Sequence, residues 1–365
     1  MALYVGLSIW HFLVLLMGLR PDSIDAAQCW PNQPEDKVAR MNKAIVSIFV
    51  VLSFLLLWFL TAFRSAAIGN DTSNYLYYFN IFSKGIDRSR DFEIGFQYLN
   101  YLISRFTLDQ HAFLIIIATI IYGGTGLYIL KYSKNPAVSL CLFFGLFFSV
   151  YTNTLRQGIA MMIALYGYQF LKDGKKIPAA LVFLLAMAFH TTALCCFLLF
   201  LDVKILEKWW FVLGLTALCA VISFSGVLRT VVDTLVPRYS HYFAGKYASS
   251  GWFAVSVYLL SYLVLYLMIN GSINTDCKPD KIVATSFTLL LILTAFGYAV
   301  NLFERAAGYY LLIAVTEIPN MLYRGKAKHF RLWLLCICTV FLLMFLATLI
   351  FRPEWNHLYP YEFWH

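Results

Sequence analysis

Apolar runs about as long as a bilayer is thick recur along the whole chain. A transmembrane helix needs about 20 mostly apolar residues. Single segments of this kind lie at 3–19, 43–63, 111–130, 209–227, 252–270 and 330–351. With 61% hydrophobic and 13% charged residues, the chain lacks the polar surface of a water-soluble protein. The sequence therefore predicts an all-α, polytopic integral membrane protein, with residues 1–365 forming a single transmembrane domain.

Three longer apolar stretches are interrupted by polar residues and are interpreted as helix pairs. The interruptions are Thr152 to Gln157 within 136–171, His190 within 177–203, and Asn301 to Arg305 within 281–323. Each half is long enough for a short or broken span. Counting these pairs predicts about twelve transmembrane helices.

Basic residues in the short loops predict the orientation, because lysine and arginine are enriched in cytoplasmic loops. Loops 20–43, 131–135, 172–176, 204–208, 271–281 and 324–331 are placed inside, and they hold 17 of the 28 basic residues. Both termini, a long loop at 64–110 and a tail at 352–365 then lie on the outer, periplasmic side. The net charge of +9 is interpreted as a topology signal and not as a nucleic-acid surface.

Lysine and arginine divide unequally between the two sides. The inner loops carry thirteen lysines and four arginines, whereas the outer regions carry two lysines, Lys84 and Lys246, and nine arginines. The outer arginines are Arg64, Arg88, Arg90, Arg105, Arg156, Arg229, Arg238, Arg305 and Arg352. Arginine binds phosphate and carboxylate in a bidentate manner, so the bias favours an anionic ligand outside. The alternative is ion pairing with the outer carboxylates Asp71, Asp87, Asp91, Glu93, Asp233 and Glu304.

Three inward-running helices are predicted to begin at the outer face with polar residues. Thr152 to Thr154 precede Arg156-Gln157, His190 precedes two threonines, and Asn301 precedes Glu304-Arg305. Helix N-termini offer free N–H groups and a positive dipole end, which suit phosphate oxygens. The alternative is that the arginines reach to the interface and His190 only interrupts a helix. Because ionisable groups are costly at membrane depth, the set favours an anion site.

The outer loop at 64–110 supplies carboxylates and aromatic rings. It begins with Gly69-Asn70-Asp71-Thr72 and an aromatic run from Tyr75, followed by Asp91-Phe92-Glu93. Phe92, Phe96, Leu99, Leu102, Ile103 and Phe106 then recur at helical spacing. These predict an amphipathic helix along the outer membrane interface. Tyrosine could stack on sugar rings and a carboxylate could accept a hydroxyl proton, although an interfacial aromatic belt explains most of the rings.

The order of these motifs resembles a known family. They are Gly69-Asn70-Asp71-Thr72 with Tyr75, Glu93-Ile94-Gly95-Phe96, Arg156-Gln157-Gly158-Ile159-Ala160, Ala188-Phe189-His190-Thr191-Thr192-Ala193-Leu194, and Glu304-Arg305 with Tyr309. Together they resemble the EpsG-like branch of the bacterial Wzy-type polysaccharide polymerases. His190 is followed by Thr-Thr where many relatives carry Thr-Ser or a single Ser, which leaves the helix cap chemically intact.

The resemblance implies a multi-spanning glycosyltransferase with a glycosyltransferase-C-like fold in the bacterial inner membrane. Such enzymes join undecaprenyl-pyrophosphate-linked oligosaccharide units into O-antigen, capsule or exopolysaccharide at the periplasmic face. The growing chain is displaced directly from its lipid pyrophosphate by a hydroxyl of the next unit. A flippase and a chain-length regulator are the expected partners, beside the membrane lipids.

The expected site combines cations for the leaving group with a base for the acceptor. Arg156, Arg305 and Arg64 are the candidate pyrophosphate ligands, with Gln157, Tyr75 and Tyr309 as further substrate-binding residues. The candidate bases are His190, Asp71, Glu93 and Glu304. We expect no metal and no cofactor.

Three other functions use similar features. The nearest is another lipid-linked-sugar glycosyltransferase or an O-antigen ligase, which would not produce a ladder of repeat units. A flippase or transporter would carry more charge through the membrane than His11 and Glu317 or show an internal repeat. A membrane acyltransferase would need a donor site on the inner side.

Overall fold

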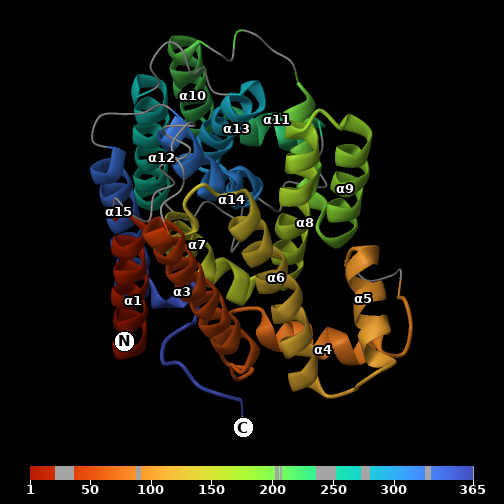
Figure 1. Cartoon of the computed structure of the whole chain (residues 1–365). Coiled ribbons are helices and arrows are strands. Elements are labelled where there is room, and N and C mark those ends of the chain that lie inside the picture. The colour runs from red at the N-terminus through yellow and green to blue at the C-terminus, as the bar shows by residue number, and fades with distance from the viewer. Residues whose placement is uncertain are drawn as a thin grey trace. The chain divides into compact units, whose positions relative to one another are not determined.

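The computed structural model describes residues 1–20, 37–87, 92–201, 205, 208–235, 252–272, 280–324 and 330–364. Across these ranges the regular structure is helical, with one isolated bridge between Arg64 and Phe363, which confirms the all-α prediction (Figure 1). Arg88, Arg90, Asp91, Arg238 and Lys246, named above, lie outside the described residues.

The chain forms two compact units. The first comprises Met1–Tyr166, Leu184–Thr191 and Lys328–His365, and the second comprises Gly167–Phe183 and Thr192–Ala327. Each unit is therefore assembled from segments that are distant in the sequence.

The first unit is built around α7. Its helices are α1 (Ala2–Gly18), α3 (Lys37–Ala62), α4 (Thr72–Phe82), α5 (Ile94–Ser104), α6 (Gln110–Tyr132), α7 (Pro136–Asn153) and α15 (Phe330–Phe351). Asn135 caps α7 by accepting a hydrogen bond from Val138 N, and Pro136 follows at the first helical position, where its missing N–H costs nothing. α1, α3, α6 and α15 all pack against α7.

Small residues allow close helix contacts in this unit. A Cβ on Gly145 of α7 would lie 3.0 Å from the carbonyl oxygen of Phe341 in α15. A Cβ on Gly18 at the end of α1 would lie 2.5 Å from the Ala137 Cβ. Close backbone approach at glycine is a common means of packing helices in a membrane, where apolar burial does not favour protein over lipid.

The second unit is centred on α13. It contains most of η2 (Thr191–Phe200), then α10 (Trp209–Phe224), α11 (Val227–Leu235), α12 (Trp252–Ser272), α13 (Lys281–Phe296) and α14 (Asn301–Arg324). α13 packs against α10, α12 and α14. Two further helices, α8 (Leu155–Lys172) and α9 (Lys176–Phe189), contribute residues to both units.

The predicted interruptions occur in the structure. α7 ends at Asn153 and α8 begins at Leu155, α9 ends immediately before His190, and α14 begins at Asn301. Among the described residues, four helices are long and apolar enough to cross a membrane: Met41–Ala62, Gln110–Tyr132, Pro136–Asn153 and Arg331–Phe351. Several shorter apolar helices accompany them. The chain is thus a membrane-helix protein, and the count of twelve spans stays a prediction.

The tail after α15 is joined to the connection between α3 and α4. Ser65 N donates to Glu362 O at 2.9 Å, and Trp364 N donates to Phe63 O at 2.9 Å. The Trp364 ring stacks on His111 with ring centroids 5.1 Å apart. The tail is therefore part of the first unit.

Candidate functional site

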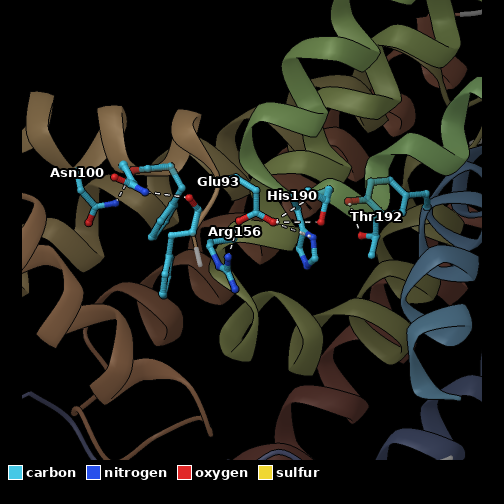
Figure 2. Close-up of polar contacts among 10 residues, drawn as sticks. Glu93, Asn100, Arg156, His190 and Thr192 are labelled. Carbon is cyan, nitrogen blue, oxygen red and sulfur yellow. Dashed lines mark hydrogen bonds and ion pairs between the residues drawn. The ribbon is translucent and has the colours of Figure 1, made fainter. Parts of the chain in front are cut away.

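Three predicted residues from separate segments meet in the first unit. Glu93 is the residue before α5, Arg156 is the second residue of α8, and His190 follows α9. Figure 2 shows the Glu93 carboxylate between the Arg156 guanidinium and the His190 ring. The side chains are 12%, 22% and 11% exposed, respectively. The cluster is thus enclosed but still reaches solvent.

The Glu93 carboxylate is the centre of this cluster. Its Oε2 accepts a hydrogen bond from Arg156 Nη1. Its Oε1 accepts from Thr191 N at 3.0 Å, and lies 3.5 Å from both Thr191 Oγ1 and His190 Nδ1. Thr191 N is the first amide of η2, so the carboxylate also caps a helix start, where negative charge is favoured.

Arg156 has further contacts besides Glu93. Its guanidinium lies over the Phe92 ring, 4.2 Å from the centroid. It also interacts with the Tyr75 hydroxyl by charge and hydrogen bonding. Its Nε makes no hydrogen bond with the described residues. Stacking on a ring and bonding to a carboxylate fix the plane of the guanidinium, which leaves donor capacity for an anion.

Gly95 allows α5 to lie close enough to α9 for this cluster to form. A Cβ at Gly95 would be 2.6 Å from the Ala188 carbonyl oxygen and 3.0 Å from the Ala188 Cβ. Contacts below 3.0 Å with backbone atoms require the two helices to separate. Gly95 therefore allows Glu93 to approach His190.

The Gly69-Asn70-Asp71-Thr72 motif forms a tight connection beside the start of α8. Gly69 has a φ of 87°, which only glycine adopts readily. Asn70 N donates to Asn153 Oδ1 at 2.5 Å, three residues before Arg156. Asp71 is the half-buried N-cap residue of α4. It makes no side-chain hydrogen bond to the described part of that helix.

Comparison with known proteins identifies the chain. The model of the EpsG family matches residues 47–363. The chain belongs to the EpsG family. No curated protein and no solved structure matches it. EpsG membership indicates a membrane protein of the polysaccharide-polymerase type, and the matched region includes the whole Glu93–Arg156–His190 cluster.

Arg64 of this EpsG-family chain is enclosed by the protein. Its side chain is fully buried. Nε donates to Thr72 Oγ1 at 3.2 Å, and Nη1 donates to Thr61 O. Burial lowers the pKa of Arg64 to about 10, so it remains cationic at neutral pH. Arg64 is therefore covered in this structure, which the sequence does not show, and its role as a pyrophosphate ligand stays a prediction.

Tyr75, predicted from the sequence to bind substrate, is also buried. It is 5% exposed and its ring packs edge-on against Phe96, with centroids 5.6 Å apart. Burial raises the pKa of Tyr75, so the hydroxyl stays neutral beside Arg156. A ring in this position has no free face for a sugar. Tyr75 instead supports Arg156 from inside the unit.

The other predicted residues lie in α14 or beside Arg156. In the second unit, Glu304 is half-buried and Arg305 is exposed in the first turn of α14. Tyr309 is buried, with its hydroxyl 3.3 Å from Thr192 Oγ1. Gln157, next to Arg156, is also buried. Glu304, Arg305 and Tyr309 belong to the second unit, whereas Gln157 belongs to the first.

Some residues make contacts in the two units that the sequence did not predict. Phe92 was predicted only as part of an apolar helix face, and Thr191 only as a polar residue after His190. The tyrosine next to Tyr309, Tyr310, donates to Cys195 O at 2.6 Å in the second unit. Glu317, an intramembrane carboxylate by sequence, pairs with Lys172 at 2.5 Å. Adjacency to Glu93 was the sequence signal for Phe92, adjacency to His190 that for Thr191, and position within an apolar segment that for Glu317; Tyr310 had none.

Proposed function

We propose that this EpsG-family chain is a membrane glycosyltransferase that polymerises lipid-linked oligosaccharides. Its substrates would be repeat units on undecaprenyl pyrophosphate, presented at the periplasmic face of the bacterial inner membrane. The observation that carries the proposal is the convergence of Glu93, Arg156 and His190. It combines a fixed cation, an oriented imidazole and a partly exposed position in a protein of the polymerase type.

Arg156 would act on the leaving group. As the anomeric C–O bond breaks, negative charge develops on the lipid pyrophosphate, and a donor already held in place stabilises that charge without reorganisation. Glu93 and the Phe92 ring hold the Arg156 guanidinium in place. A guanidinium suits this role because it can bind two phosphate oxygens at once.

His190 would act on the acceptor. Glu93 faces Nδ1 of the ring, so the Nδ1–H tautomer is favoured and Nε2 becomes the nitrogen that can take a proton. The acceptor oxygen forms the new bond to the anomeric carbon, its proton passes to His190, and the lipid pyrophosphate departs. A direct displacement of this kind inverts the anomeric centre.

The arrangement also ranks the other candidate bases. The Glu93 carboxylate already faces the four donors described above, so its oxygens are used to orient those groups. Glu93 is therefore a weaker candidate for the base than His190. Asp71 is half-buried beside the Arg156 helix and remains the second candidate for the base. Glu304 lies in the second unit and is not used in the mechanism.

The test is a polymerisation assay with a purified lipid-linked repeat unit in proteoliposomes. We expect Arg156→Ala to slow chain extension by about a hundredfold or more and His190→Ala by about a hundredfold to ten-thousandfold. Arg229→Ala is the matched control, because Arg229 is 63% exposed and paired with Asp233 within one helix. Polymer formed at the wild-type rate by both site variants would overturn the proposal. A single transfer product without a ladder would indicate a ligase.

A further inference from the structure

Helix α5, which follows Glu93, buries polar and apolar side chains together on one side and exposes apolar side chains on the other. On α5, Gln97, Asn100 and Ser104 are 1%, 0% and 8% exposed. Ile94, Tyr98 and Leu102 are 41%, 56% and 56% exposed, and they follow at intervals of four residues, so they lie along one face. Phe96 and Ile103 are buried on the other side. α5 therefore has apolar side chains on both sides, whereas a helix packed on a protein surface in water exposes mainly polar ones.

The buried polar side chains of α5 make hydrogen bonds inside the first unit, while Asn100 Oδ1 has no partner among the described residues. Gln97 Nε2 donates to Phe92 O at 2.9 Å, and Gln97 Oε1 accepts from Asp87 N at 3.0 Å. Asn100 Nδ2 donates to Phe96 O at 2.7 Å. The buried side is thus used to hold the connection before α5, and the exposed apolar side is left for an apolar environment.

The exposed face continues towards a membrane helix. Phe106 and Leu108, between α5 and α6, are 83% and 67% exposed. α6 begins at Gln110, and its span Gln110–Tyr132 is long and apolar enough to cross a bilayer. A connection of this length reaches at most about 20 Å when fully extended. The end of α5 is therefore held near the point where α6 enters the membrane.

The neighbouring helix α4 provides an internal contrast. Its exposed positions are Ser73, Asn74 and Asn80, which are polar, and Tyr77, which is 58% exposed. Leu76, Phe79 and Phe82 are buried. Three of the four exposed positions of α4 are therefore polar, as in a helix facing water. Two helices of the same loop and the same length thus differ in the polarity of their exposed surface.

We propose that the exposed α5 face, formed by Ile94, Tyr98, Leu102 and Phe106, docks onto phospholipid of the leaflet that α6 enters first. On a helix that lies at a membrane surface, apolar side chains enter the acyl region and aromatic side chains lie at its boundary with the headgroups. Arg105 is exposed beside Phe106 and stacks on Tyr101, 4.4 Å from the ring centroid, which places a cation next to the lipid-facing side chains. A cation in this position can contact lipid phosphate.

Lipid docking of α5 has a consequence for the site, and this part rests on the proposed function. Glu93 is the residue at the start of α5, so a helix anchored in lipid holds Glu93 and its partner Arg156 at a fixed depth. The phosphates of a lipid-linked donor lie at the headgroup level of the same leaflet. The α5 face would thereby match the depth of the Arg156 guanidinium to that of the pyrophosphate.

The docking itself is tested without substrate. The protein is reconstituted with a phospholipid that carries a photoactivatable diazirine in its acyl chain, and labelled peptides are identified by mass spectrometry. We expect residues 94–106 to be labelled as strongly as the exposed apolar positions of α3, and residues 73–80 of α4 to be labelled weakly. Labelling of α5 no stronger than that of α4 would overturn the inference, for example because a protein partner covers this face.

Paired variants then test the consequence for the site. Leu102→Asp is expected to lower labelling of α5 and to raise the KM for lipid-linked substrate by about fivefold, within the range for a charge near a membrane interface, with little change in kcat. Asn80→Asp, an exposed polar position on α4, is the control and should change neither. If α5 is labelled but the wild-type protein makes no polymer, the proposed function fails and the lipid docking stands. An unchanged KM in a Leu102→Asp variant that has lost labelling would overturn the depth-matching role.

Discussion

Helix α8 carries one partner of each of two enclosed ion pairs, and the two pairs are built differently. Near its start, Arg156 pairs with Glu93, with side chains 22% and 12% exposed. At its last residue, Lys172 pairs with Glu317 at 2.5 Å, with side chains 14% and 3% exposed. The first pair lies in one compact unit and the second pair in the other.

The difference is in how the carboxylate is used. Glu93 also bonds Thr191 and faces His190, so its charge organises a helix start and an ionisable ring. Glu317 is more deeply buried and forms an ion pair with Lys172. The Lys172 ammonium also lies 5.8 Å from the Tyr168 ring centroid. A carboxylate shared among several donors at a partly open position suits chemistry, whereas a deeply buried one-to-one pair suits the joining of two helices. Intramembrane charge alone does not distinguish the two uses.

The largest expected effect separates the pairs by stability. Glu317→Gln leaves the Lys172 ammonium enclosed without its counter-charge, and removing one partner of a buried pair typically costs about 3–5 kcal/mol. We expect a clear fall in the thermal unfolding midpoint in detergent, and polymerisation per folded molecule close to wild type. The double variant Lys172→Met with Glu317→Leu should regain most of the stability. Normal stability combined with lost activity in Glu317→Gln would show that this pair also serves the reaction.

A smaller effect on stability and a large one on activity is expected at the other pair. Glu93→Gln keeps the shape of the side chain but removes the charge that holds Arg156 and orients His190. Hydrogen bonds to charged groups contribute about 1.5–3 kcal/mol, so the polymerisation rate should fall by about tenfold to a hundredfold. Glu354→Gln is the control, because Glu354 is 56% exposed and lies 3.8 Å from Arg352. A Glu93→Gln enzyme as active as this control would remove the distinction between the pairs.

The smallest expected effect tests the close helix approach that positions Glu93 in the first pair. Gly95→Ala should move α5 away from Ala188, with a cost of about 1–3 kcal/mol for overpacking and a matching loss of polymerisation rate. Gly123→Ala in α6 is the control, since a Cβ there meets nothing within 4 Å. The control should be neutral or slightly stabilising, because alanine favours helix more than glycine does. Equal effects of the two changes, measured as unfolding midpoint and rate, would show that close approach at Gly95 is unimportant.

The sequence was informative about helix ends where polar residues interrupt the apolar runs. Polar residues inside apolar runs predicted the helix breaks at Thr154, before His190 and before Asn301, because a helix within a membrane tolerates such residues mainly at interruptions. The same interruptions identified Arg156 and His190, and the polar residues of the outer loop identified Glu93 as a candidate carboxylate. The family match over residues 47–363 then confirmed the resemblance to EpsG-type proteins.

The sequence was less informative about depth within the first unit. Arg64 and Tyr75 have the right chemistry for an outer site, but long-range contacts with the tail and with Phe96 enclose them. Helical periodicity also selected Phe96 and Ile103 as the membrane face of α5, and the structure buries both. Periodicity finds an apolar face but cannot tell lipid from protein, since both are apolar surroundings.

The joined tail has a consequence for how the protein is made. Residues 60–70 hold Arg64 and the turn before Asp71, yet several of their hydrogen-bond partners are about 290 to 300 positions later in the chain: Gly69 N donates to His357 O at 3.0 Å, and the Tyr361 hydroxyl donates to Leu60 O at 2.5 Å. At about 5–20 residues per second, these partners emerge from the ribosome some tens of seconds after the turn itself. During that interval the turn lacks these hydrogen bonds, so the first unit cannot reach its final structure before the tail has been made.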